Sequence, residues 1–215
     1  MEIEGLRRNY DAGKLDFEQL CSDPIDQFAV WFEQAKQSSS AAWFEVNAMT
    51  LATSTADGSV TSRIILLKQF GAEGFTFFTN YDSNKGRQLA ENPRASLLFY
   101  WPHIERQVRI DGQVAKTDAA TSEAYFQARP RESQIGAVVS PQSQVIDQQH
   151  PLAEAAKELS DRLAGGAVSR PVNWGGYLLK PVRIEFWQGR PNRLHDRCLY
   201  TLQSDGSWQI ARLAP

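Results

Sequence analysis

The segment RLHDR, residues 193–197, carries two arginines and a histidine at alternate positions near the C-terminal end of the chain. Read as a β-strand, it places Arg193, His195 and Arg197 on one face, because successive side chains of a strand point to opposite sides. Three such groups would span roughly 13 Å and repel one another unless an anionic or electron-rich ligand faces them. A merely solvated strand edge more naturally alternates charge sign, so this face is a candidate binding surface, with a solvated edge as the alternative.

Two further segments place cations at the ends of expected elements. In SRIILLK, Arg63 and Lys68 bracket an apolar run; five residues apart in an ideal strand, they would face opposite sides unless a bulge intervenes. In NKGRQ, residues 84–88, Lys85 and the backbone N–H groups of a helix start have the chemistry to hold a phosphate. Taken alone, each segment is more typical of a solvated strand end or an exposed helix start.

The segment YFQARPRES combines a phenol, an arginine and a serine hydroxyl. On a helix, Tyr125 and Arg129 are four residues apart and share a face, and Ser133 lies just beyond Pro130. The arginine supplies bidentate charge and the hydroxyl groups supply direction, so the three side chains would make a phosphate clamp. A solvated helix end explains the same residues and stays open as the alternative.

Other chemistries find no support in the spacing. The three histidines, His103, His150 and His195, have no metal-ligand spacing, and neither Cys21 nor Cys198 belongs to a C-x-x-C pair. A Ser-His-Asp triad at the last histidine would need the adjacent aspartate, which would point to the other face of a strand. Glycine-rich loops of the Rossmann or Walker type are absent from the sequence. We therefore expect no metal site and no dinucleotide fold.

The elements that must position these residues follow from hydrophobic periodicity. Helices are expected at residues 22–37, where Pro24 suits the first turn, and at residues 83–93, 118–129 and 151–163. Strands are expected at residues 48–70, folded about the Asp57-Gly58 turn, and at residues 75–80, 94–101, 106–116, 175–189, 193–202 and 207–215. Sequential strands joined by tight turns, with helices inserted rather than alternating, favour an α+β fold that is mainly antiparallel β.

Composition limits the domain count and the partners. The chain has 215 residues, 42% of them hydrophobic, which suffices for one core without disulfides. A net charge of −2 gives no global footprint for nucleic acid or an anionic membrane, and no apolar run approaches a membrane span. Two widely spaced cysteines and a polar beginning favour a cytoplasmic location. We expect a flexible N-terminal segment at residues 1–20 and a single domain over residues 21–215.

Seven motifs occur in one order along nearly the whole chain: RIILLK, FFTN, NPRASLLFYW, ERQV, YFQARPRESQIGA, EFWQG and RLHDR. Together they resemble the FMN-dependent pyridoxamine 5′-phosphate oxidases. The resemblance implies an FMN-binding split barrel with peripheral helices. It also implies a homodimer that uses a C-terminal dimerisation region and holds FMN at the subunit interface.

The resemblance implies roles for particular residues. The FMN contacts would be Arg63, Ile64, Ile65, Leu66, Leu67, Lys68, Phe78, Thr79, Lys85, Gln107, Gln142, Ser143, Trp187 and Arg197. The substrate phosphate would be held by Lys68, Tyr125, Arg129 and Ser133. Arg193 and His195 would lie over the substrate's pyridine ring, and Arg7 and Tyr10 match the family's N-terminal segment that closes over the site. The sequence departs from many family members at Asn84, where a basic residue is common.

Arg193, His195 and Arg197 are the expected catalytic residues. Arg197 would stabilise the reduced flavin, while His195 would either orient the substrate or accept a proton. The implied reaction oxidises pyridoxamine 5′-phosphate or pyridoxine 5′-phosphate to pyridoxal 5′-phosphate. Hydride passes to FMN, and O2 reoxidises the flavin, giving hydrogen peroxide, with ammonia released from the amine substrate.

Two other functions remain open from the sequence. A related split-barrel flavin oxidase could act on another ring substrate, which should not need the clamp of Tyr125, Arg129 and Ser133. A non-catalytic protein could bind flavin or pyridoxal phosphate without turnover. A peroxide assay separates this binding protein from an oxidase.

Overall fold

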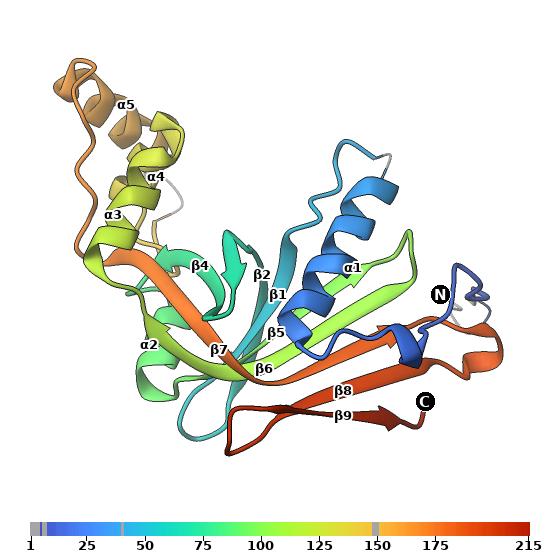
Figure 1. Ribbon diagram of the computed structural model, residues 1–215. Coiled ribbons are helices and arrows are strands. Elements are labelled where there is room, and N and C mark those ends of the chain that lie inside the picture. Colours follow the sequence, from blue (N-terminus) through green and yellow to red (C-terminus); the bar gives the residue numbers. More distant parts are fainter. Residues whose placement is uncertain (1–4, 6–7, 40, 148–150) are drawn as a thin grey trace.

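Figure 1 shows the computed structural model, which describes residues 5, 8–39, 41–147 and 151–215. These residues form one curled antiparallel sheet of nine strands: β1 (Ala48–Ser54), β2 (Val60–Leu66), β3 (Gln69–Gly71), β4 (Gly74–Asn80), β5 (Arg94–Trp101), β6 (Arg106–Lys116), β7 (Trp174–Gln188), β8 (Asp196–Leu202) and β9 (Trp208–Leu213). The strand order is β2-β1-β5-β6-β7-β4-β3, and β8 and β9 continue from the second half of β7. The expected mainly antiparallel α+β class is confirmed.

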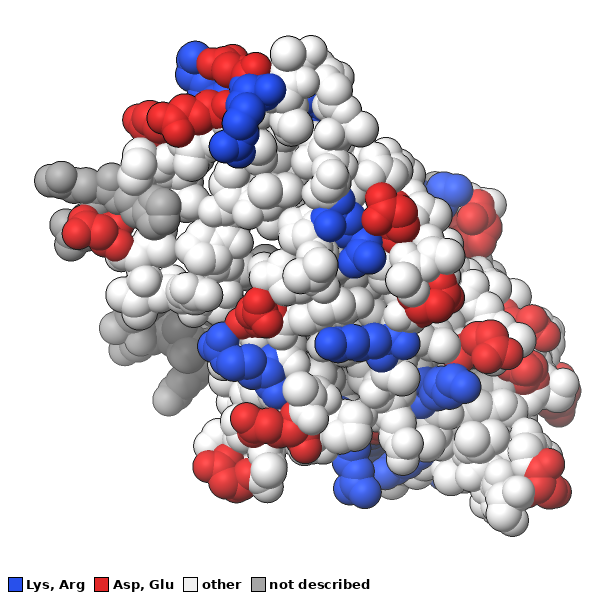
Figure 2. Space-filling model, turned by 90° about the vertical axis from the view of Figure 1, so that its left-hand side faces the viewer, with Lys and Arg blue, Asp and Glu red and all other residues white. Residues whose placement is uncertain are grey.

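Five α-helices lie around this sheet: α1 (Pro24–Ser38), α2 (Asn84–Glu91), α3 (Ala119–Ala128), α4 (Arg131–Val139) and α5 (Leu152–Leu163). Two short 3-10 turns, η1 (Phe17–Gln19) and η2 (Pro191–Arg193), complete the described elements. None of the helices in the described part of the chain combines the length and the apolar composition that a membrane span requires. On the face shown in Figure 2, basic and acidic side chains are interspersed rather than gathered by sign.

Helix α1 covers one face of the sheet and makes the core with it (Figure 1). The helix begins where the sequence predicts, because the Asp23 carboxylate accepts a hydrogen bond from the Ile25 N–H at 2.7 Å and Pro24 occupies the first turn. Phe28 is fully buried and packs edge-on against Phe75 and Phe99, with ring centroids 5.0 Å away in both cases. The other face of the sheet leaves Ile64 67% exposed and Tyr100 48% exposed.

Strand β7 is the longest strand and pairs with three others. Its first half pairs with β4, its second half pairs with β8, and β6 runs beside it, with a register shift between Asp111 and Gly112. Helices α3, α4 and α5 gather at the end where β7 begins, and η2 lies at the other end (Figure 1). Trp174 and Trp187 lie at these two ends and are at most roughly 43 Å apart, at about 3.3 Å per residue.

The prediction that RLHDR begins a strand is wrong for residues 193–195 and correct from Asp196 onward. Pro191, Asn192 and Arg193 form the η2 turn, and β8 begins only at Asp196. Asn192 and Arg193 have positive φ values of 56° and 63°, which no strand residue adopts. Proline lacks the N–H that a strand ladder needs, and asparagine tolerates the left-handed conformation, so this stretch makes the turn between β7 and β8.

Helix α4 was not expected from the sequence. It follows directly after Pro130, and Arg129 caps α3 with an extended backbone (ψ 151°) instead of continuing that helix. The residue before a proline is pushed out of the helical region by a steric clash, which explains the break. The periodicity predicted that Tyr125 and Arg129 share a helix face. This prediction is wrong, because Arg129 lies beyond the end of α3.

Candidate functional site

Most of the residues expected to hold phosphate groups meet in one cavity of about 510 Å³, here named the α2–α4 cavity. Strands β2 and β4 and helices α2, α3 and α4 contribute its walls. The described residues that line it are Arg63, Ile64, Ile65, Leu66, Lys68, Phe78, Thr79, Lys85, Tyr125, Ala128, Arg129, Pro130, Ser133, Gln142 and Trp174. None of these residues is acidic, so the cavity is locally cationic although the chain as a whole is not.

Arg63 and Lys68 reach the same cavity because β2 ends between them. The strand stops at Leu66, and the Lys68 N–H then donates to the Thr76 carbonyl at 2.9 Å, which redirects the chain. The Arg63 guanidinium is oriented by hydrogen bonds to the Leu51 carbonyl at 3.0 Å and to Thr53 Oγ1 at 2.7 Å. A strand end, and not a bulge, brings the two cations together.

Lys85 is a buried ammonium at the start of α2. Its Nζ donates to three neutral oxygens: Thr79 Oγ1 at 3.1 Å, Ser83 Oγ at 3.2 Å and Gln142 Oε1 at 3.0 Å. Burial, and secondarily the charge of Arg63, lowers the pKa of Lys85 to about 8. A phosphate beside Lys85 would supply the negative charge that these neutral acceptors lack, so the site fits a phosphate-bearing cofactor.

The expected phosphate clamp forms the opposite wall. Tyr125 stacks on Phe78 with ring centroids 3.9 Å apart, and the Arg129 guanidinium lies 4.7 Å from the centre of the Trp174 ring. The buried NH1 of Arg129 has no hydrogen-bond partner among the described residues, and burial lowers the pKa of this arginine. Ser133 comes from the first turn of α4. The clamp is therefore assembled by the α3–α4 break rather than by one helix face.

Trp174 was missed by the sequence reasoning. It begins β7 and belongs to a small core with Phe126 and Ile135 beneath the α3–α5 helices, and it also faces the α2–α4 cavity. In the sequence it is one aromatic residue at the start of a strand, which is indistinguishable from an ordinary core position. Its place under Arg129 depends on how the helices pack onto β7.

A second cavity, of about 600 Å³, lies at the other end of β7 and is here named the η2 cavity. Its described lining residues are Arg8, Asn9, Tyr10, Trp187, Arg190, Asn192, Arg193 and His195. The His195 ring lies 4.6 Å from the Trp187 ring, and Tyr10 meets both rings edge-on at 5.6 Å. The expected ring-binding pair, Arg193 and His195, is thus brought together with Tyr10, whereas Arg7 lies outside the described residues.

The protonation state of His195 follows from one hydrogen bond. The Arg190 backbone N–H donates to His195 Nδ1 at 3.1 Å, so Nδ1 is an acceptor and a neutral ring carries its proton on Nε2. Burial, followed by the positive charge of Arg193, lowers the pKa of His195. His195 is therefore held as a neutral imidazole with its proton on Nε2.

Arg197 lies on the uncovered sheet face and does not line either cavity among the described residues. Its Nε donates to Glu185 Oε1 at 2.8 Å, which raises the pKa of Arg197, and the other oxygen of Glu185 binds Arg109 at 2.8 Å. Strand register places Arg197 opposite Trp187, and Trp187 opposite Gln107. Glu185 was not expected from the sequence, where it is a single acid within a strand pattern.

The remaining expected cofactor contacts differ in exposure. Leu67 is 4% exposed and belongs to the sheet core, so its side chain points away from the α2–α4 cavity. Ser143 is exposed and has a positive φ of 69° in the loop after α4. Gln142 in the same loop does reach the cavity, through its hydrogen bond with Lys85.

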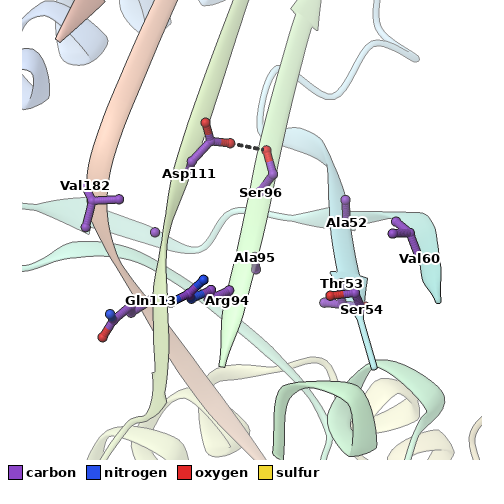
Figure 3. Close-up of a pocket in the computed structure, with 11 residues that line it drawn as sticks. Ala52, Thr53, Ser54, Val60, Arg94, Ala95, Ser96, Asp111, Gln113 and Val182 are labelled. Atoms are coloured by element: carbon purple, nitrogen blue, oxygen red, sulfur yellow. Dashed lines mark hydrogen bonds between the residues drawn. The ribbon is translucent and has the colours of Figure 1, made fainter. Parts of the chain in front are cut away.

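A third cavity, of about 440 Å³, hollows the uncovered face over β1, β5 and β6 (Figure 3). Ser96 Oγ donates to Asp111 Oδ1 at 2.7 Å on its wall, and Arg94 and Gln113 lie at its lower rim in the view (Figure 3). None of the residues expected to bind cofactor or substrate lines it. The candidate site therefore consists of the α2–α4 and η2 cavities, which one chain keeps at opposite ends of β7.

The sequence matches two family models. Residues 26–162 match the model described as pyridoxamine 5'-phosphate oxidase, and residues 174–215 match the pyridoxine 5'-phosphate oxidase C-terminal dimerisation region. A relative from Rhodopirellula baltica named pyridoxine/pyridoxamine 5'-phosphate oxidase is 48% identical, over 99% of this chain and 96% of the relative. A relative of the same name from Paraburkholderia phytofirmans is 51% identical, over 98% of this chain and 97% of its own length.

Two solved structures share the fold. PhzG from Burkholderia lata 383, determined in complex with tetrahydrophenazine-1-carboxylic acid, has a TM-score of 0.89 and 30% identity, covering 97% of this chain and 100% of PhzG. A pyridoxamine 5'-phosphate oxidase-related, FMN-binding protein from Nostoc punctiforme has a TM-score of 0.70 and 18% identity, covering 92% and 99%. Both likenesses support the split-barrel arrangement of the sheet.

Proposed function

The chain belongs to the pyridoxamine 5′-phosphate oxidase family, and from this premise we propose that it oxidises pyridoxamine 5′-phosphate and pyridoxine 5′-phosphate to pyridoxal 5′-phosphate. It is an oxidoreductase with FMN as its cofactor. The observation that carries the choice of substrate is the α2–α4 cavity, whose described lining has no acid and four cations, one of which, Arg129, belongs to the clamp with Tyr125 and Ser133. Two phosphate-bearing ligands need such a surplus of positive charge.

The chemistry of electron transfer belongs to the cofactor. FMN, when bound, accepts a hydride equivalent from the substrate and passes the electrons to O2, which yields hydrogen peroxide. Lys85 and Arg63 would hold its phosphate, since both are partly or fully buried and their hydrogen-bond partners in the described part of the chain are neutral oxygens. Asn84 supplies no charge, so Lys85 and Arg63 would provide the positive charge at the FMN phosphate.

The η2 cavity would receive the substrate ring. Arg193 would bind polar ring substituents, and the Nε2–H of His195 would donate a hydrogen bond to the substrate. Because Nδ1 already accepts the Arg190 N–H, an orienting role for His195 is favoured over that of a general base. Arg197, fixed by Glu185, would place its positive charge beside the flavin ring.

Both cavities can serve one substrate only if two chains contribute. We infer a homodimer in which the α2–α4 cavity of one protomer faces the η2 cavity of its partner, with FMN between them. The match to a dimerisation region over residues 174–215 supports this arrangement, and so does the exposed Ile64 on the uncovered face. Burying that face would also remove a patch of apolar surface from water.

A second substrate class is raised by PhzG, which was determined with tetrahydrophenazine-1-carboxylic acid. A phenazine ligand carries no phosphate, so it would leave Arg129 NH1 without the anion that the buried guanidinium lacks. The clamp therefore favours the phosphorylated pyridine substrates.

The test is a visible spectrum of the FMN-loaded, desalted protein before and after anaerobic addition of pyridoxamine 5′-phosphate. We expect the flavin absorbance to bleach and to recover in air with formation of hydrogen peroxide. If the retained flavin bleaches only with a phenazine-type substrate, the substrate assignment is wrong and the enzyme acts on that class instead. If the retained flavin never bleaches, the protein binds flavin without turnover.

A further inference from the structure

Residues 8–15, here named the strap, form neither a helix nor a strand, and Arg8, Asn9 and Tyr10 at its beginning line the η2 cavity. Tyr10 is its central contact. The Tyr10 ring packs so closely on the chain at Gly189 that a Cβ atom there would approach Tyr10 Cδ1 to 2.8 Å. The same ring lies edge-on to Trp187 and His195. The position of the strap therefore decides the shape of the cavity that would receive the substrate ring.

One buried carboxylate holds the strap on both sides of Tyr10. Glu105 is 0% exposed and lies at the end of the β5–β6 turn with a positive φ of 56°. Its Oε2 accepts the Ala12 N–H at 2.8 Å, and its Oε1 forms an ion pair with Arg8 NH2 at 2.9 Å. Because Arg8 and Ala12 flank Tyr10 by two residues each, a single side chain fixes the short segment between them.

Glu105 also fixes the surface beneath Tyr10. Its backbone carbonyl accepts the Gly189 N–H at 2.8 Å, and Gly189 directly follows the β7 segment that carries Trp187. The left-handed backbone at Glu105 costs free energy for a residue with a Cβ atom, so the contacts on both sides must maintain it. The two surfaces that enclose the Tyr10 ring are thereby joined through one residue.

We propose that Glu105 is a positioning residue that latches the strap over the η2 cavity and thereby sets the affinity for the substrate ring. The effect on substrate affinity rests on the proposed function, because it requires that the substrate ring enters this cavity. The charge of Glu105 is central to the latch: Oε1 has no hydrogen bond among the described residues and has Arg8 as its ion-pair partner. A buried carboxylate that loses such a partner is strongly disfavoured.

The C-terminal half of the strap has its own anchor. Asp196 Oδ2 accepts the Leu15 N–H at 3.2 Å, and Arg190 NH1 donates to the Gly13 carbonyl at 3.0 Å. Loss of the Glu105 latch should therefore release residues 8–12 while residues 13–15 stay in place. A general loosening of the fold would release residues 13–15 as well, so the contrast between the two halves of the strap distinguishes the two cases.

The experiment compares the full-length Glu105→Gln variant with Arg8→Gln, which removes the same ion pair from its exposed side and does not disturb the core. Glu33→Gln is the matched control, because it removes a glutamate from an exposed ion pair with Lys36. Hydrogen–deuterium exchange of the strap is measured without substrate, and kcat and KM are measured with pyridoxamine 5′-phosphate.

We expect faster exchange in residues 8–12 of both latch variants, and a KM raised roughly tenfold with kcat changed much less, as for the loss of one charge-assisted contact. The double variant should be no worse than either single variant, because both act through one ion pair. Unchanged KM, additive effects or unchanged exchange would overturn the proposal. If the wild type does not oxidise pyridoxamine 5′-phosphate, the proposed function fails, while the exchange data still accept or reject the latch.

Discussion

Lys85 and Arg129 are buried or partly buried cations whose described contacts include no anion, so both are candidates to bind one. Each is a cation withdrawn from water, and each has its pKa lowered chiefly by burial. The described contacts of Lys85 are neutral oxygens, and Arg129 keeps one buried NH1 without a hydrogen-bond partner. Phosphate groups of a cofactor and a substrate would complete both environments, and this makes separate predictions for the two residues.

Lys85 should make FMN binding pH-dependent. Its pKa of about 8 in the free protein means that the ammonium loses its proton as the pH rises through 8, whereas a bound phosphate favours the charged form. Between about pH 7, where the phosphate of FMN is still doubly charged, and pH 8, FMN affinity should therefore be highest, and it should weaken as the pH rises above 8. Lys85→Met should weaken FMN binding roughly ten- to hundredfold at pH 7 and remove this pH dependence.

Fluorescence titration of FMN measures both the affinity and its pH dependence, with the exposed Lys180→Met as control. An unchanged pH profile in Lys85→Met would contradict the assignment.

Arg129 should discriminate phosphorylated from unphosphorylated substrates. Arg129→Ala removes a bidentate donor, so KM for pyridoxamine 5′-phosphate should rise about ten- to hundredfold. Turnover of unphosphorylated pyridoxamine should change little, because that substrate never had the contact. Steady-state kinetics with the two substrates provide the measurement. An equal loss with both would show that Arg129 acts on folding or on the cofactor instead.

At the scale of elements, the site depends on where strands and helices end. The end of β2 brings Arg63 and Lys68 together, the α3–α4 break brings Arg129 to Ser133, and the start of α2 aims Lys85 inward. The α2 start is tightly seated, because a Cβ atom on Gly86 would lie 2.0 Å from the Tyr81 carbonyl oxygen. A glycine is therefore required there for close approach of the backbone.

Gly86→Ala should push α2 away from β4. We expect roughly 1–3 kcal/mol lower stability from overpacking, together with weaker FMN binding because Lys85 moves with the helix. Gly71→Ala is the matched control, since nothing lies within 4 Å of a Cβ atom at that position. Denaturant unfolding and FMN titration are the measurements. If Gly86→Ala binds FMN as tightly as Gly71→Ala, the placement of α2 is not what positions Lys85.

At the scale of the whole molecule, the arrangement along β7 separates the clamp from the ring-binding residues. The α2–α4 cavity lies at the Trp174 end and the η2 cavity at the Trp187 end. A single chain cannot fold these ends onto each other without breaking the pairing of β7 with β4, β6 and β8. In a pair of chains related by a two-fold axis, the α2–α4 cavity of each chain can face the η2 cavity of the other. Two-fold symmetry is the usual geometry of a homodimer.

Shared sites make a complementation test possible. Arg129→Ala and Arg193→Ala should each be nearly inactive as homodimers at low substrate concentration. A mixed dimer would have one site with both changes and one intact site, so random mixing by co-expression should restore about a quarter of wild-type activity. Activity of the co-expressed pair is compared with the sum of the two separate variants. Activity no higher than that sum would mean that each site is built from one chain.

The sequence by itself determined the fold class, the family, helix α1 and the turn at Asp57-Gly58, because these depend on local periodicity, capping and an ordered series of motifs. Periodicity failed at RLHDR and at α4, where Pro191 and Pro130 make turns and a helix break that alternation alone does not reveal. The site-residue assignments and the cytoplasmic location stay predictions.

Only the tertiary structure decided which of the expected residues are neighbours. It placed Trp174 beneath Arg129, Glu185 between Arg109 and Arg197, and Glu105 beneath the strap. Each of these contacts joins residues more than ten positions apart, and the sequence pattern of one element carries no information on what packs against it. The separation of the two cavities follows from the length and pairing of β7, a property that belongs to the sheet as a whole.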